Sequence, residues 1–228
     1  MTATTSTPTH GAKTGNGNAM TDTADPAFWD RIAEKYSKSP IKDMPAYEQT
    51  MERVRAHLKP TDHVLEVGCG TASTALLLSP EVAHVTASDL SSKMIDIGRE
   101  KARKSKTENI DFVVGTPFCD ALTPGSYDAV MAFSFLHLVE DLPATLARIH
   151  ELLKPGGLLI SKTVCLAEQT RLWGIPIAVM RFFGYAPYVN LLKTADLERE
   201  IAGAGFRIIE TGNYPAGPRS RFIVAKKT

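Results

Sequence analysis

The segment of this sequence best suited to chemistry is a glycine-rich loop at Gly68 and Gly70, which follows the apolar run 63–67. Glycine permits a tight turn and lets the backbone approach a ligand closely, while the amides that open a following helix point toward that ligand. Alone, such a loop is a weak signal, because many loops of this kind are ordinary strand–helix turns.

Two carboxylates near the loop strengthen the signal. Glu66 lies two residues before Gly68, where a strand should end, and a charge there is costly unless it meets a cation or hydrogen-bond donors. Asp89 closes the next apolar run, 21 positions after Gly68, which is typical of a carboxylate that binds ribose hydroxyls. Together these residues predict a nucleoside ligand at the ends of two strands.

The elements that must position these residues alternate along the chain. Strands are expected at 63–67, 83–88, 110–114, 127–133 and 158–163, with helices at 71–78, 91–106 and 142–153. This alternation indicates βαβ units and a parallel sheet buried on both faces. A helix at 194–204 precedes strands at 206–211 and 221–225, whose connection is too short for a parallel crossover. The predicted fold is α/β, with a Rossmann-like seven-stranded sheet (six parallel strands plus one antiparallel C-terminal strand) and helices on both faces.

The rest of the chain divides by composition. Residues 1–24 have almost nothing to bury and are predicted to be a disordered tail, and residues 25–228 form one domain. Within it, 25–60 should be a helical cap and 164–192 a substrate-side insert. The insert is apolar and aromatic from Leu172 to Tyr185, which suits the wall of an apolar pocket. A helix packed on the core, a dimer contact and peripheral contact with a membrane surface stay open as alternatives.

Composition excludes several classes of protein. The chain has 228 residues, is 43% hydrophobic, and carries a formal charge of +1, which gives no support to a nucleic-acid partner. Three cysteines without a paired spacing argue against disulfides or zinc. With no apolar stretch long enough to span a membrane and no secretory signal, we expect a cytoplasmic protein.

The motif Glu66-x-Gly68-x-Gly70-x-Ala72 with Asp89 resembles the first two motifs of class I S-adenosylmethionine-dependent methyltransferases. The likeness is greatest to the small-molecule group that includes the ubiquinone/menaquinone methyltransferases. It extends to the segments 126–130, 136–138 and 154–157 and to the closing antiparallel hairpin. The resemblance implies methyl transfer with S-adenosyl-L-methionine as cofactor and a small-molecule methyl acceptor.

The resemblance also implies roles for individual residues. The backbone of Gly68, Cys69 and Gly70 would line the methionine part of the cofactor, with Glu66 near its amino group and Asp89 on both ribose hydroxyls. Around the adenine, Leu90 and Met94 would pack on the base, although Met94 also suits a core stripe with Ile97. Many relatives have an aspartate after the third strand, where this chain has Thr116. The remaining residues expected to contact the cofactor are Pro117, Phe133 and Tyr36, the last through the carboxylate unless it only packs in the lid.

His137 is the predicted catalytic residue, as a base near the transferred methyl; the alternative is that it holds the loop or the cofactor carboxylate. The Asn/Asp-Pro-Pro-Tyr motif of enzymes that methylate amino groups of bases is missing. Ser134 and Phe135 stand where catechol-type relatives have acidic metal ligands. We therefore predict metal-free transfer to a small, partly apolar molecule. A non-catalytic S-adenosylmethionine-binding protein and an NAD-dependent oxidoreductase are the alternatives, and Glu66 and the closing hairpin oppose the second.

Overall fold

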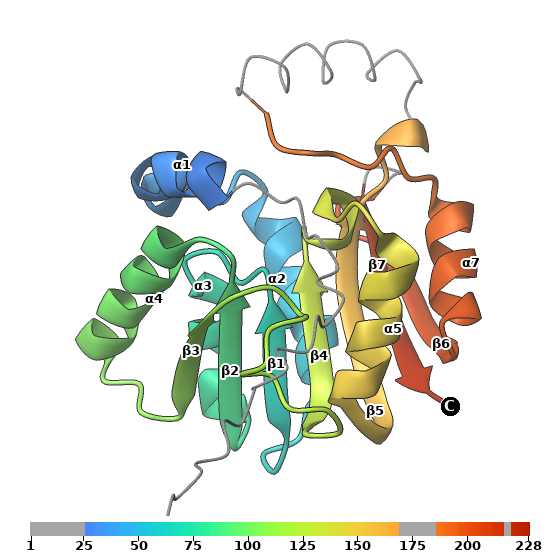
Figure 1. Ribbon diagram of the computed structural model, residues 1–228, viewed down its shortest axis with the longest axis horizontal. Coiled ribbons are helices and arrows are strands. Elements are labelled where there is room, and N and C mark those ends of the chain that lie inside the picture. The colour runs from blue at the N-terminus through green and yellow to red at the C-terminus, as the bar shows by residue number, and fades with distance from the viewer. Residues whose placement is uncertain (1–25, 169–185, 217–219) are drawn as a thin grey trace, which may run out of the picture.

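The computed structural model describes residues 26–168, 186–216 and 220–228, so the predicted tail and most of the predicted insert lie outside the described residues. Its centre is one seven-stranded sheet (Figure 1). In spatial order the strands are β3 (Ile110–Val114), β2 (His84–Asp89), β1 (His63–Val67), β4 (Tyr127–Phe133), β5 (Leu153–Val164), β7 (Ser220–Lys227) and β6 (Phe206–Asn213). Strand β7 pairs antiparallel with both β5 and β6, and the other pairings are parallel, which confirms the predicted fold.

Helices cover both faces of the sheet, as its apolar strands require. One face packs against α2 (Met44–Arg55), α3 (Ser73–Leu78) and α4 (Ser92–Ser105). The other packs against α5 (Leu142–Leu152) and α7 (Thr194–Gly203). The strands alternate between these two cores, so that Met131 faces the first and Val130 the second. Three short 3-10 helices complete the described elements: η1 (Ser79–Glu81), η2 (Leu136–Leu138) and η3 (Leu166–Glu168).

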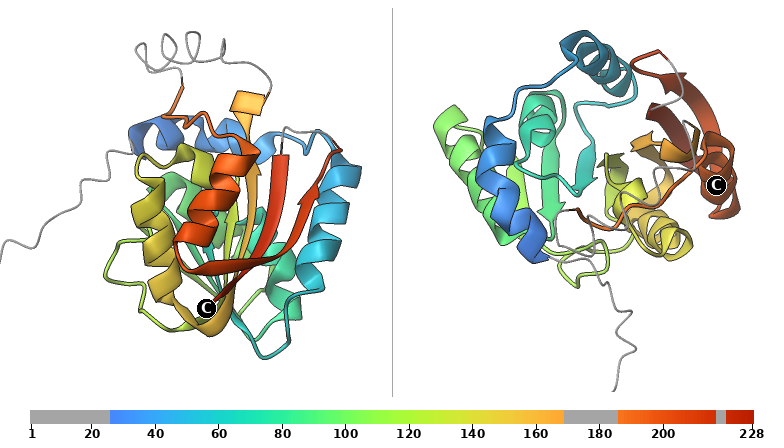
Figure 2. Two further views of the ribbon diagram at one scale, coloured as in Figure 1. Left: turned by 90° about the vertical axis from the view of Figure 1, so that its right-hand side faces the viewer. Right: turned by 90° about the horizontal axis from the view of Figure 1, so that it is seen from above.

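The two helices of the predicted cap have different positions. Helix α1 (Pro26–Lys38) crosses above the carboxyl ends of the strands, whereas α2 runs down the side of the sheet (Figures 1 and 2). Met51 and Val54 of α2 are buried in the core of that face. In the described residues, α1 is therefore the part of segment 25–60 that lies over the edge where the glycine loop stands.

Two element boundaries differ from the sequence expectation for local reasons. Helix α3 begins at Ser73 because Ala72 has a left-handed backbone, with φ of 56°. Strand β5 begins at Leu153 because Leu153 already pairs with Tyr127. The turn expected at 154–157 is instead part of strand β5, where the pairing with β4 is irregular. After the pair of Tyr127 with Leu153, the next pair along the two strands is Ala129 with Leu158. No helix in the described parts of the chain is long and apolar enough to cross a membrane.

Candidate active site

The candidate site lies where the order of the sheet reverses. Strand β1 connects through α3 to β2 on one side, while β4 lies on the other side of β1. At such a switch point the loops after neighbouring strands diverge and leave a crevice outside the carboxyl ends. The loops after β1, β2, β3 and β4 all reach this place, and α1 crosses above it (Figure 1).

The glycine loop is held in a left-handed conformation by strand β2. Gly68 and Gly70 have φ of 63° and 53°, values that favour glycine. The Gly70 amide donates a hydrogen bond to Asp89 Oδ2 at 2.8 Å, and the Ser91 amide donates to Asp89 Oδ1 at 2.9 Å. Asp89 therefore binds both the loop after β1 and the loop after its own strand, and it ties the two sides of the site together.

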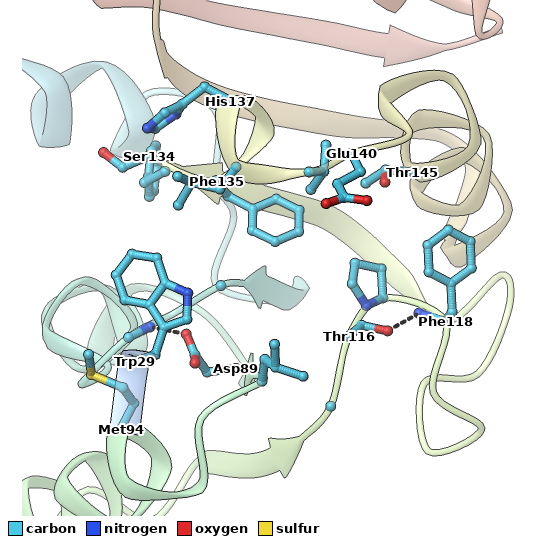
Figure 3. Close-up of a pocket in the computed structure, with 18 of the residues that line it drawn as sticks. Trp29, Asp89, Met94, Thr116, Phe118, Ser134, Phe135, His137, Glu140 and Thr145 are labelled. Atoms are coloured by element: carbon cyan, nitrogen blue, oxygen red, sulfur yellow. Dashed lines mark hydrogen bonds between the residues drawn. The ribbon is translucent and has the colours of Figure 1, made fainter. Parts of the chain in front are cut away.

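A cavity of about 380 Å³ opens between these loops, within the range of roughly 300–1,000 Å³ usual for small-ligand sites. Ten of the twelve residues predicted to form the site line it: Tyr36, Gly68, Gly70, Asp89, Leu90, Met94, Thr116, Pro117, Phe133 and His137. Figure 3 shows the rings of Trp29 and Phe135 projecting into it from different elements. The structure thus brings together residues from five separate segments of the chain.

The other two predicted residues, Glu66 and Cys69, lie outside this lining. The Cys69 amide donates to the Ser88 carbonyl at 2.9 Å, and its carbonyl accepts from the Ala72 amide. Burial raises the pKa of its thiol well above the ordinary value. The expected contact of Cys69 with a cofactor therefore stays a prediction.

Glu66 is a buried carboxyl group with an unmet hydrogen-bonding need. Its side chain is 3% exposed, and among the described residues its Oε2 has no hydrogen-bond partner. Loss of water raises its pKa to about 8, with Asp89 adding to the rise and a backbone hydrogen bond from Ala75 opposing it. A buried acceptor of this kind fits a ligand that brings a cationic or N–H donor, as the amino group of S-adenosylmethionine would.

Asp89 is suited to bind a diol although both of its oxygens already accept amides. Each carboxylate oxygen has two lone-pair sites, so each can accept a further hydrogen bond from a ligand in the cavity. Burial raises the pKa of Asp89, and the amides of Ser91 and Gly70 oppose that rise. These two amides favour the ionised form, which is the stronger acceptor.

Helix α1 contributes two aromatic side chains to the site. A Cβ placed on Gly70 would lie 3.4 Å from Tyr36 Cε1, so the Tyr36 ring rests on the glycine loop. Tyr36 is nevertheless 51% exposed, because its outer side faces the open cavity. Loss of water raises its pKa, helped by the charges of Glu66 and Asp89. Trp29 of the same helix, which was not among the predicted site residues, also lines the cavity.

The residues expected around an adenine ring line the cavity from the segments that follow β2 and β3. Met94 is 1% exposed and lines the cavity, so it is at once a core residue and a wall residue. Thr116 Oγ1 accepts a hydrogen bond from the Phe118 amide at 3.3 Å, which leaves the hydroxyl hydrogen free to point elsewhere (Figure 3). The part played by Thr116 toward a base stays a prediction.

His137 lies in η2, immediately after β4, and its environment keeps it neutral. The residue is 9% exposed, and its Nδ1 has no hydrogen-bond partner among the described residues. Loss of water lowers its pKa to about 4. Its backbone is anchored, since the His137 carbonyl accepts the Asn190 amide at 2.7 Å. The cavity therefore contains a neutral imidazole at pH 7.

Sequence reasoning did not include several wall residues in the site. They come from α1, from the loop after β3, from the connection after β4 and from the start of α5, and they are Trp29, Gly115, Phe118, Ser134, Phe135, Leu138, Val139, Glu140, Asp141 and Thr145. A signal existed for Phe135, which lies two residues after the end of β4. A Cβ on Gly68 would lie 2.5 Å from Phe135 Cδ2, so glycine at 68 is required by this ring.

Comparison with known proteins agrees with this geometry. Residues 64–157 match the family model for a methyltransferase domain. The demethylmenaquinone methyltransferase of Symbiobacterium thermophilum is 30% identical over 140 residues, covering 58% of this chain and 56% of the relative. The chain spans about half the length of the curated relatives it matches.

Solved structures share the fold at low sequence identity. The geranyl diphosphate C-methyltransferase from Streptomyces coelicolor has a TM-score of 0.66 and 15% identity, covering 80% of this chain and 79% of that one. The [4+2]-cyclase SpnF has a TM-score of 0.65 and 16% identity, covering 78% of this chain and 79% of the cyclase. The domain match over residues 64–157, the relatives and the sheet topology together indicate a methyltransferase domain similar to those of class I S-adenosylmethionine-dependent methyltransferases. The cofactor of that class is S-adenosylmethionine, and Glu66, whose Oε2 has no partner among the described residues, fits its amino group.

Proposed function

We propose that this protein transfers a methyl group from S-adenosylmethionine to a small, partly apolar acceptor. The observation that carries the proposal is a cavity lined by the glycine loop and by Asp89, which accepts the Gly70 amide. The buried carboxyl group of Glu66, two residues before Gly68, has one oxygen without a partner among the described residues. These are acceptors suited to a ligand with a diol and an amino group. The proposal is supported by the methyltransferase domain at 64–157.

The residues of this chain divide the work of binding. We propose that Glu66 accepts from the amino group, that Asp89 accepts from the ribose hydroxyls, and that Tyr36 reaches the carboxylate. Leu90, Met94, Thr116, Pro117 and Phe133 would surround the base. When bound, S-adenosylmethionine would supply a methyl group that passes in line from its positively charged sulfur to a nucleophile and leaves S-adenosylhomocysteine.

The chain's further contribution would be alignment, exclusion of water and removal of a proton. The rings of Trp29, Phe133 and Phe135 make much of the cavity wall apolar. His137 would accept the proton of the acceptor, because a pKa of about 4 leaves its ring neutral and able to take one at pH 7. That low pKa also makes His137 a weak base, so an acceptor that develops negative charge beside it must raise its proton affinity.

The class of acceptor is inferred from the wall and from the relatives. Aromatic side chains from three segments suit a partly apolar molecule, and the matched relatives are named for demethylmenaquinone. We propose transfer without a metal, since Ser134 and Phe135 stand where related enzymes have acidic ligands. Among the described residues no three His, Cys, Asp or Glu side chains group as metal ligands would. The geranyl diphosphate neighbour was crystallised with Mg²⁺, so assays should include a chelator arm.

A second candidate function is cofactor binding without methyl transfer. It is favoured by one observation, the shared fold of a protein named as a [4+2]-cyclase. Fold alone does not determine chemistry. The two candidates agree on the cofactor and differ in turnover.

Two measurements test these proposals. Titration calorimetry with S-adenosylmethionine, S-adenosylhomocysteine and NAD should show binding of the sulfur compounds only; binding of NAD alone would overturn the cofactor. Incubation with methyl-labelled cofactor and a panel of quinols, phenols, thiols and amines, with and without a chelator, should label one class of acceptor. Binding without any labelled product would favour the binding-only function.

The domain division and the setting of the protein are also proposals. We propose residues 25–228 as the catalytic domain, with the insert at 164–192 as the acceptor wall. The small charge imbalance supports a small molecule over nucleic acid as partner, and a cytoplasmic location is proposed on the same composition.

A further inference from the structure

Asp30 of helix α1 is not among the predicted site residues, yet it makes hydrogen bonds to the segment that follows β2. Its Oδ1 accepts from the Ser91 hydroxyl at 2.5 Å and from the Lys93 amide at 3.2 Å. Ser91 is the N-cap of α4, where its Oγ also accepts the Met94 amide at 3.1 Å. A carboxylate from one helix thus completes the cap of another.

These bonds continue directly into the site. The Ser91 amide donates to Asp89 Oδ1, and Asp89 Oδ2 accepts from Gly70. An unbroken chain of hydrogen bonds therefore runs from Asp30 through Ser91 and Asp89 to the glycine loop. Because Asp30 fixes both the hydroxyl of Ser91 and the first turn of α4, it limits the positions that the Ser91 amide can take beneath Asp89.

The same helix covers the cavity. Trp29, adjacent to Asp30, lines it, and Tyr36, two turns further, rests on Gly70. Ala33 between them is fully buried. Helix α1 is thus anchored on the loop after β2 through Asp30 and on the loop after β1 through Tyr36, and both loops form the cavity.

We propose that Asp30 is a positioning residue, which acts through Ser91 to hold the Asp89 carboxylate toward a bound ribose and thereby couples ligand binding to the seating of helix α1. This inference rests on the proposed function, since it takes a nucleoside as the ligand at Asp89. In this proposal, helix α1 contributes to the affinity for the cofactor in addition to covering the cavity.

The test compares carboxylate substitutions on the same helix. S-adenosylhomocysteine serves as the probe, with affinity from calorimetry and dissociation rate from stopped-flow tryptophan fluorescence in a Trp173→Phe background, which leaves Trp29 as the single tryptophan. Asp30→Ala should weaken binding about 3- to 30-fold, chiefly by faster dissociation, as expected for losing hydrogen bonds to a charged group. Asp30→Asn keeps an acceptor oxygen and should recover most of the affinity. Glu34→Ala is the matched control, because its carboxylate is 75% exposed and pairs with Lys38 on α1 itself.

A double-mutant cycle separates positioning from a merely structural role. If Asp30 acts through Asp89, Asp30→Ala should change affinity by less than about twofold in an Asp89→Ala background. Equal losses in both backgrounds, or no loss in the otherwise native protein, would overturn the inference while leaving the cofactor assignment intact. If the native protein fails to bind S-adenosylhomocysteine at all, the proposed function fails first, and the two failures are thereby distinguished.

Discussion

Glu66 is a buried carboxyl group, and its burial opposes its ionisation in the folded protein. Its pKa in the folded protein is about 8, above the ordinary 4.5, because burial disfavours the charge. A raised folded pKa means that its contribution to stability is fully present below pH 4.5 and is lost as pH rises toward 8. A cationic ligand would reverse this cost by pairing with the ionised form.

Glu66→Gln should therefore move stability and binding in opposite directions. We expect the variant to lose less stability than the native protein between pH 5 and pH 8, because it has no carboxyl group to ionise. Its affinity for S-adenosylhomocysteine should fall about tenfold or more, the loss of roughly one charge-assisted hydrogen bond. Urea unfolding at both pH values and calorimetry measure the two effects. A variant whose stability follows the native pH dependence would contradict the cause assigned to this pKa.

His137 should be needed for turnover more than for cofactor binding. His137→Ala is expected to lower kcat by about 10²-fold or more, the usual contribution of a general base, with affinity for S-adenosylhomocysteine changed less than about threefold. His137→Asn is the informative comparison, since it keeps hydrogen-bonding capacity without the titrating ring. Turnover that survives in the Asn variant would assign His137 to loop positioning instead.

At the scale of elements, the loop after β1 and the connection after β4 are fitted to each other. Gly68 lies against the Phe135 ring so closely that an added Cβ would come within 2.5 Å of Cδ2. The same residue has φ of 63°, so two independent constraints act at one position. The fit places a ring from one strand end on the loop of another, which shapes the cavity between them.

Gly68→Ala should lower affinity for S-adenosylhomocysteine by about tenfold or more, because Phe135 or the loop must move into the cavity. Gly125→Ala provides the control, since Gly125 has φ of 65° and nothing within 4 Å of an added Cβ. It should show the cost of backbone strain alone, about 1 kcal/mol of stability, and no change in binding. Equal effects of both substitutions on affinity would contradict a role for the Phe135 contact.

At the scale of the whole molecule, one ionic cluster joins α2 to the far edge strand. Arg53 donates from Nε and Nη2 to the two oxygens of Glu210 on β6, each at 2.7 Å, and His57 Nε2 lies 2.7 Å from Glu210 Oε2. The Arg53 hydrogen bonds, with that of His57, hold the pKa of Glu210 at about 2, against the opposing effect of burial. The helix that packs on the sheet face is thereby fastened to the last strand of the sheet.

Glu210→Gln should destabilise the fold at neutral pH by about 1–2 kcal/mol. This loss is smaller than the lowered pKa of Glu210 alone would give, because Arg53 is partly exposed and solvent screens the ion pair. A lowered folded pKa means that the carboxylate stabilises above pH 4.5 and that this contribution is lost as pH falls toward 2. The difference from the native protein should therefore shrink across that acidic range in urea unfolding. Glu48→Gln, on the exposed side of α2, should leave stability unchanged; an equal loss there would point to general charge effects.

Much of the architecture could be read from local pattern. The strand, glycine loop and helix around Gly68 are contiguous, so turn chemistry and apolar runs define them without long-range contacts. The same holds for Asp89 at the end of its strand, and for the closing hairpin, whose short connection excludes a parallel crossover. These features depend on residues close in sequence, and the structure confirms the strands and their directions.

The composition of the cavity wall and the linkage between elements required the tertiary structure. Trp29 and Phe118 carry no local mark that separates a wall residue from a core residue, because periodicity reports that a face is buried but not what covers it. The chain from Asp30 to Gly70 joins three segments, and the ion pair of Arg53 with Glu210 spans 157 positions. Sequence alone determined the alternation of strands and helices, from which a parallel sheet follows, and the cofactor motif, since both are local patterns. Only the fold decided which distant side chains meet, because packing brings them together through contacts that no local pattern contains.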